Sequence, residues 1–183
     1  VGLVLQIESS FFNEERDFYF GDQEESGLCI RVAEPFRVKG GNGTIINDRG
    51  ERNESGTWGR EFRWIDYSGL SGNKRVGMLI VPDAENARPC WSHSRDYGVL
   101  VANPFPRQPQ ERREPFVKTW VKKGERYRLG FSVLIYEMDS GTRPQRSALM
   151  SGGAGQNAER ILLTNTAENE TYDIEIQNGR VVG

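Results

Sequence analysis

The chain has 183 residues, which is enough for one domain with a sizeable core. Its 24 Lys and Arg residues nearly balance its 26 Asp and Glu residues, and the net charge is -2, so there is no electrostatic reason to expect nucleic acid or an anionic membrane as a partner. The longest strongly apolar run, 76–82, is far shorter than the about 20 apolar residues of a membrane-spanning helix, so we expect no membrane span.

The residue pattern predicts an all-β protein. Glycine is frequent, 10% of the residues are aromatic, and short runs of β-forming residues recur between turn signals. In chain order, strands are expected at 3–8, 18–20, 27–33, 44–46, 61–67, 75–81, 96–102, 116–121 and 126–137. Two pairs of neighbouring runs predict hairpins, 61–67 with 75–81 and 116–121 with 126–137. We expect a mostly antiparallel β-sandwich.

Side-chain alternation predicts which faces of these strands are buried. In the last long run, Leu129, Phe131, Val133 and Ile135 are two residues apart, so all four are expected on the core face. The run 96–102 is apolar on both faces, which is typical of a central strand covered on both sides.

The composition changes after Glu137. Residues 138–160 are rich in Gly, Ser, Arg and Gln, which is typical of a flexible linker or an exposed loop. We therefore expect a β-sandwich domain over 1–137, a linker or loop over 138–160, and a short β-hairpin extension over 161–183.

The stretch WSHSRDYG, 91–98, holds the only histidine of the chain. If a strand extends back to Trp91, the period of two places Trp91, His93, Arg95 and Tyr97 on one face. The rings can stack on a sugar ring, the guanidinium can anchor ligand oxygens, and the imidazole can transfer a proton near neutral pH. Together, these types of side chain favour a polar, ring-shaped ligand.

The same stretch has a second interpretation, a buried polar network in which Arg95 pairs with an acid and His93 donates to a carbonyl. The sequence leaves both interpretations open. For the catalytic interpretation, the candidate acid–base residues are His93, Asp83 and Asp96. The candidate substrate contacts are Trp91, Arg95, Tyr97, Asn86 and Asp66.

The turn-rich loop 81–89 precedes this stretch. Asp83, Glu85 and Asn86 supply oxygen atoms that suit a sugar hydroxyl or calcium, but three such residues on one loop are a weak metal signal, and a solvated loop is their ordinary explanation. Asp66 lies near the end of its predicted strand, where it is a candidate site residue or faces water. No other cofactor is evident.

Several enzyme classes are excluded by missing motifs. The chain has neither GxxxxGK[ST] nor GxSxG, so a P-loop and a nucleophile elbow are absent. One histidine and two distant cysteines cannot assemble a zinc or copper site. Cys29 and Cys90 allow at most one disulfide, and their apolar surroundings are also typical of buried free thiols.

An ordered series of motifs covers most of 3–137: GLCIRVA (27–33), WGR (58–60), WIDYSG (64–69), WSHSRDYG (91–98) and ANPF (102–105). Together they resemble a bacterial family of unknown function, called PmoA-like here because its members are often labelled "methane oxygenase PmoA". That family has an aromatic-His-x-Arg-Asp-Tyr-Gly segment, matched from His93 to Gly98, and an upstream His-Pro-x-x-Asn loop, in which Asn86 matches but Asp83 replaces the histidine.

The resemblance implies more than the residues alone. The family has an earlier segment rich in His and Trp that this chain lacks, so the chain looks like the C-terminal part of such a domain. PmoA-like proteins are similar to large β-sandwiches of the galactose-mutarotase type, which implies a carbohydrate-related role and a periplasmic or extracellular location. The label does not imply copper chemistry, because this chain has one histidine.

These observations predict a domain that binds, and in one interpretation processes, a small sugar or an oligosaccharide through WSHSRDYG. The alternative is a non-catalytic structural or sugar-binding module whose chemistry lies in a missing N-terminal part. The sequence does not specify an oligomeric state.

Overall fold

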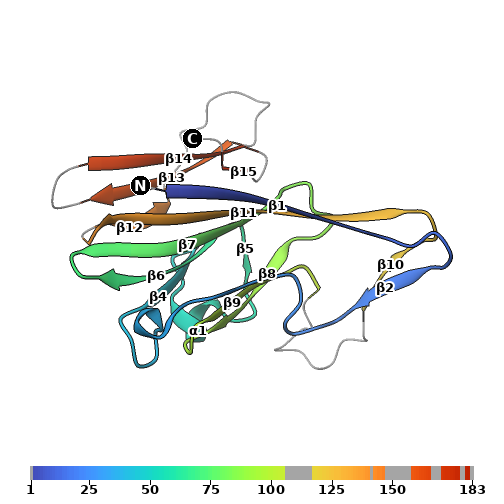
Figure 1. The fold of residues 1–183 in the computed structure, drawn as a ribbon, viewed down its shortest axis with the longest axis horizontal. Coiled ribbons are helices and arrows are strands. Elements are labelled where there is room, and N and C mark those ends of the chain that lie inside the picture. Colours follow the sequence, from blue (N-terminus) through green and yellow to red (C-terminus); the bar gives the residue numbers. More distant parts are fainter. Residues whose placement is uncertain are drawn as a thin grey trace.

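The computed structural model describes residues 2–105 and 117–140, together with the strand positions of 142–146, 158–165, 170–177 and 180–181 (Figure 1). The fold is an all-β sandwich, as predicted, and helical structure in these residues is limited to the turns η1 (Glu34–Phe36) and α1 (Asn53–Thr57). No helix in the described residues is long and apolar enough to cross a membrane.

Two antiparallel sheets form the sandwich (Figure 1). The large sheet has the order β1 (Gly2–Phe12), β11 (Arg126–Asp139), β7 (Lys74–Pro82), β6 (Ile65–Ser71) and β4 (Thr44–Asn47). The small sheet has the order β3 (Leu28–Arg31), β9 (Val99–Asn103), β8 (Cys90–Arg95) and β5 (Glu61–Phe62).

The main core lies between the two sheets. Strand β11 contributes Leu129, Phe131 and Val133 to it from alternate positions, and Ile80 of β7 joins them. The predicted core face of β11 is therefore confirmed for these three residues, whereas Ile135 at the end of the row is 39% exposed. From the small sheet, Cys90, Leu100 and Ala102 close the core.

A second apolar layer covers the outer face of the large sheet. It consists of Trp64, Leu79, Val81, Leu134, Tyr136 and Met138. A third sheet, of β12 (Thr142–Arg146), β13 (Ala158–Asn165), β14 (Glu170–Gln177) and β15 (Arg180–Val181), lies on this side, and β15 contacts β7 and β11. Strand β12 lies inside the predicted linker, while residues 147–157 are outside the described residues.

Two predictions of strand pairing need correction. Strand β10 (Lys118–Val121) pairs with β2 (Phe18–Gly21), not with β11, whose first residues pair with β1 instead. The predicted strand 61–67 is broken at Arg63: its first residues form β5 in the small sheet and its last residues join β6 in the large sheet. The hairpin of β6 with β7 is confirmed.

Candidate functional site

The candidate site lies on the outer face of β8, in the small sheet. Cys90 points into the core, and Ser94 on the same face hydrogen-bonds Thr57 of α1 at 2.7 Å. The alternation of the strand therefore directs Trp91, His93 and Arg95 outward. Tyr97 does not belong to this row, because the chain turns after Arg95.

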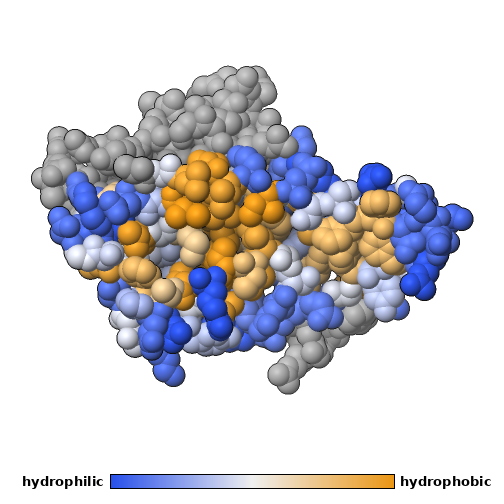
Figure 2. Space-filling model, in the orientation of Figure 1, coloured by the Kyte–Doolittle hydropathy of each residue, from blue (hydrophilic) through white to orange (hydrophobic). Residues whose placement is uncertain are grey.

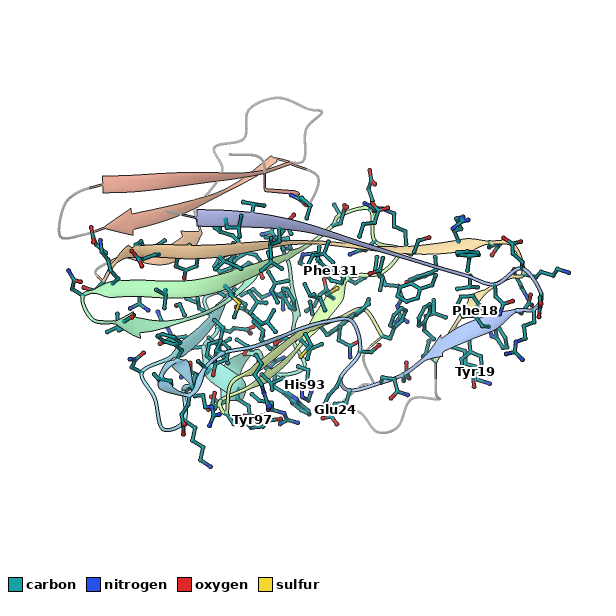
Figure 3. All side chains as sticks on the ribbon, viewed as in Figure 1. Phe18, Tyr19, Glu24, His93, Tyr97 and Phe131 are labelled. Atoms are coloured by element: carbon teal, nitrogen blue, oxygen red, sulfur yellow. The ribbon has the colours of Figure 1, made fainter. Side chains whose placement is uncertain are left out.

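His93 is almost completely buried on this outer face, with 3% of its side chain exposed. Its Nε2 atom lies 3.3 Å from Arg95 Nε and 3.3 Å from Glu25 Oε1. Its Nδ1 atom has no hydrogen-bond partner, and Glu24 Oε1 lies 4.0 Å away, which is beyond hydrogen-bond distance. Figure 3 shows His93 and Glu24 together on the side of the molecule opposite the large sheet.

The protonation of the imidazole depends on two opposing neighbours of Nε2, the Arg95 donor and the Glu25 carboxylate. When Nε2 accepts from Arg95, its lone pair is used and the proton of a neutral ring lies on Nδ1. Burial lowers the pKa of His93, Arg95 lowers it further, and the carboxylates of Glu25, Glu24 and Glu54 oppose this change. The neutral ring therefore presents a buried N–H donor that lacks an acceptor.

Arg95 is held by acidic side chains and is not free to anchor a ligand. Its Nη1 atom donates to Glu54 Oε1 at 2.8 Å, and its Nη2 atom donates to Glu24 Oε1 at 3.3 Å. The guanidinium lies 5.2 Å from the centre of the Trp58 ring, within cation–π distance. Arg95 thus orients His93 and the surrounding carboxylates.

Asp96 fixes the short helix α1 to the end of β8. Its Oδ1 atom accepts a hydrogen bond from the Glu54 backbone N–H, and its own N–H donates to Glu54 Oε2. Burial raises the pKa of Glu54, but the hydrogen bonds from Asp96 and Arg95 outweigh it and the pKa is lowered. Glu54 therefore stays ionised beside Arg95, and Asp96 acts here as a positioning residue.

The sequence analysis missed the acidic part of this site. Glu24 and Glu25 belong to the loop between β2 and β3, and Glu54 and Trp58 lie in and after α1. The backbone carbonyls of Gln23 and Glu24 accept hydrogen bonds from Asn103 Nδ2 and hold the loop over the small sheet. A pair of adjacent glutamates before Ser26-Gly27 is also an ordinary turn composition, so local pattern alone could not identify it.

Asp83 and Asn86, predicted to close the site, contact β11 of the large sheet. Asn86 hydrogen-bonds both groups of the Gly130 peptide, its Nδ2 donating to the carbonyl at 2.9 Å and its Oδ1 accepting from the N–H at 2.7 Å. The buried Asp83 carboxylate accepts from Arg128 Nη2 at 3.0 Å. These contacts tie the loop between β7 and β8 to the sheet, so we leave both residues out of the site.

Asn86→Ala is expected to lower the free energy of unfolding by about 2 kcal/mol, because two hydrogen bonds to the backbone of the buried Gly130 are lost together. Urea denaturation followed by circular dichroism measures this change. Ala87→Ser, an exposed change on the same loop, is the control and should have little effect. An Asn86→Ala variant as stable as the wild type would contradict the structural role.

Asp66 cannot share a ligand with His93. It lies within β6, fully buried, on the outer face of the large sheet, where Tyr136 Oη donates to its Oδ1 at 2.9 Å. The main core separates this face from the outer face of β8. Asp66 does lie near a strand end, as the second residue of β6, but the expectation that it faces water is wrong, because it is enclosed.

A cavity of about 680 Å³ lies away from His93. It is bounded by the inner face of the large sheet and the chain segment after β3, and its lining includes Leu3, Phe36, Met78 and Ile135. Figure 2 shows apolar side chains gathered on this face, over the first half of β1 and the strands beside it. The cavity is largely apolar and holds none of the predicted site residues.

No group of three or more His, Cys, Asp and Glu side chains in residues 2–105 and 117–140 has the geometry to hold a metal ion. At the loop considered for calcium, the Asp83 carboxylate is paired with Arg128.

Comparisons with known proteins identify a family but no function. Neither the curated proteins nor the solved structures gave a match to this chain. The sequence pattern of a family described as "Family of unknown function (DUF6807)" matches residues 2–148. This match spans the whole sandwich, including every residue around His93, and the chain therefore belongs to the DUF6807 family of unknown function.

Proposed function

We propose that this domain is PmoA-like and binds a carbohydrate on the outer face of β8, with a periplasmic or extracellular location. The observation that carries the proposal is the buried His93 Nδ1, which has no hydrogen-bond partner and faces the carboxylate of Glu24. A buried donor without an acceptor is costly, and such groups recur where a ligand completes the hydrogen bonding.

A sugar hydroxyl is the chemical group that suits this gap. It can accept a hydrogen bond from His93 Nδ1 and donate its own proton to Glu24 Oε1 at the same time. The Glu24 side chain is 50% exposed, so it can move to admit the hydroxyl oxygen. Glu25, 67% exposed and beside Nε2, can accept from a neighbouring hydroxyl of the same ring.

The surrounding groups complete the proposed site. Trp91 is half-buried on the same face of β8 and can offer its ring to the C–H face of a sugar. Arg95 and Asp96 position His93 and Glu54. The carboxylates of Glu24 and Glu25 beside the imidazole can supply the proton acceptor that a carbohydrate-processing reaction needs, so any sugar that binds should be assayed for turnover.

A thermal-shift screen with neutral mono- and oligosaccharides tests the proposal. A ligand present at about 100 times its Kd stabilises the native state by about 2.7 kcal/mol and raises Tm. We expect at least one sugar to raise the Tm of the wild type, and His93→Ala and Glu25→Gln to lose that response. Glu14→Gln, at an exposed acid in the turn between β1 and β2, is the matched control and should respond like the wild type.

The native thiols provide a second measurement at the same place. Cys29 is exposed, Cys90 is buried, and Cys29 pairs with Val101, which pairs in turn with His93. A bound sugar is expected to slow the alkylation of Cys29 by iodoacetamide in the wild type but not in His93→Ala. Should no sugar change either Tm or alkylation, while His93→Ala only melts earlier, the cluster is a structural network and the proposal is wrong.

A further inference from the structure

The two-stranded sheet of β2 and β10 presents an exposed aromatic pair outside the site around His93. Tyr19 and Trp120 are directly opposite in the register, their ring centres are 5.0 Å apart, and they are 45% and 51% exposed. Figure 3 places Tyr19 toward one end of the molecule, whereas His93 lies nearer the middle. Tyr and Trp combine a large apolar ring with a polar group and are enriched at binding interfaces.

The alternation of both strands explains why these rings face outward. Phe18 and Phe20 of β2 pack against the main core, and Val121 of β10 belongs to it. Tyr19 lies between Phe18 and Phe20, and Trp120 is next to Val121. Both rings must therefore point to the other face of the two-stranded sheet. Their positions are therefore fixed by the packing of the buried face and do not depend on a flexible loop.

Lysine side chains accompany the rings on this outer face. Lys118 Nζ lies 4.5 Å from the centre of the Tyr19 ring and 5.7 Å from that of Trp120. Lys122 Nζ lies 5.7 Å from the Trp120 ring but is paired with Asp17 at 2.9 Å. Within the described residues Lys118 has no ion-pair partner, so the Tyr19–Trp120 face, defined as these two rings and Lys118, carries one uncompensated positive charge.

We propose that the Tyr19–Trp120 face is a second binding site, for an anionic saccharide such as a chain of uronic acids. Aromatic faces stack on the C–H faces of sugar rings, and the Lys118 ammonium can leave the rings to pair with a carboxylate of the ligand. The contact that it gives up is weak, because exposed cation–π pairs contribute little. Two rings on adjacent strands suit neighbouring sugars of an extended chain.

An anionic membrane surface is a less suitable partner. Binding to such a surface through charge takes a cluster of several Lys or Arg residues, whereas this face carries one uncompensated lysine. Lys122 is paired with Asp17, so it adds no second uncompensated positive charge to which anionic lipids could bind. The chemistry of the face therefore favours a saccharide.

Trp120 supplies a spectroscopic test in the intact protein. Of the four tryptophans, Trp64 is buried, Trp58 and Trp91 are half-buried, and Trp120 is exposed. We expect a linear oligosaccharide of galacturonic acid to change the tryptophan emission of the wild type in a saturable way. Trp120→Phe is expected to lose this signal, and Trp120→Ala to weaken binding by about tenfold in calorimetry.

Charge is tested with matched variants and ligands. Lys118→Gln is expected to weaken binding by about threefold, and Lys39→Gln, an exposed lysine after η1, is expected to leave it unchanged. The fully methyl-esterified oligosaccharide keeps the rings but loses the carboxylates, so it is expected to bind more weakly than the acid form.

Three outcomes would overturn this inference: equal binding of the acid and ester forms, binding unaffected by Trp120→Ala, or binding to phosphatidylserine vesicles in place of the oligosaccharide. Circular dichroism and thermal melting confirm that each variant is folded. His93→Ala is expected to retain this binding, so the result is independent of the site on β8.

Discussion

The free energy of unfolding is expected to fall by about 4 kcal/mol between pH 4 and pH 8 because of one carboxyl group, Asp66. Burial raises the pKa of Asp66 to about 7 from an ordinary value of 3.8, and hydrogen bonds from Ser68 and Tyr136 and the charge of Arg75 only partly oppose this. Between these two pKa values the native state holds a proton that the unfolded chain has released.

The sign follows from this difference in bound protons. Because the folded form binds more protons, raising the pH destabilises it, by about 1.4 kcal/mol per pH unit between the two pKa values, after which the effect levels off above about pH 7. This is the reverse of an ordinary paired carboxylate, whose contribution is lost on acidification.

Urea denaturation of the wild type and Asp66→Asn at intervals from pH 4 to pH 8 measures this contribution. The introduced amide cannot ionise, and its oxygen can still accept from Tyr136, so the variant is expected to lose this part of the pH dependence. Other titrating groups contribute equally to both proteins and cancel in the difference. Parallel curves for the two proteins would show that Asp66 keeps an ordinary pKa.

Gly77→Ala is expected to lower the free energy of unfolding by about 3 kcal/mol. A methyl group at Gly77 would lie 2.5 Å from Tyr136 Oη and 2.7 Å from Ser68 Cβ, two buried side chains. Both neighbours are cross-strand partners of Gly77. The substitution must displace Tyr136 and break its hydrogen bond to Asp66, which adds the loss of a buried hydrogen bond to the cost of overpacking.

Gly56→Ala is the matched control. A methyl group there meets nothing closer than 3.6 Å, and Gly56 lies in α1, where alanine is the better helix former. The control is therefore expected to be neutral or slightly stabilising. Chemical denaturation of both variants gives the comparison, and equal stability of Gly77→Ala and the wild type would mean that Tyr136 does not occupy this position.

Local pattern was sufficient for the fold class and for parts of the architecture. The alternation of Leu129, Phe131 and Val133 depends only on the period of a strand, and the hairpin of β6 with β7 depends on the short turn between them. The outward direction of His93 on β8 follows from the same alternation once the strand is known to begin at Cys90.

Local sequence pattern did not predict which strands pair with each other. The residues of β10 are equally compatible with a hairpin with β11. In the structure, however, β10 pairs with β2, about 100 residues earlier in the chain. Aromatic packing of Phe20 on Phe105, with ring centres 4.5 Å apart, holds this end of the sandwich together. Such long-range pairing depends on which faces must be buried together, and the residues of one strand do not contain that information.

The sequence by itself determined the all-β class, the strand faces and the single histidine in a polar strand. The tertiary structure alone decided what surrounds that histidine: Glu24 and Glu25 come from a loop about 70 residues away, and Glu54 from α1. It also separated Asp66 from His93 by a whole core layer. The physical reason is that the two-residue period of a strand determines which side chains share a face. The burial, pKa and partners of those side chains depend on the segments that fold over that face.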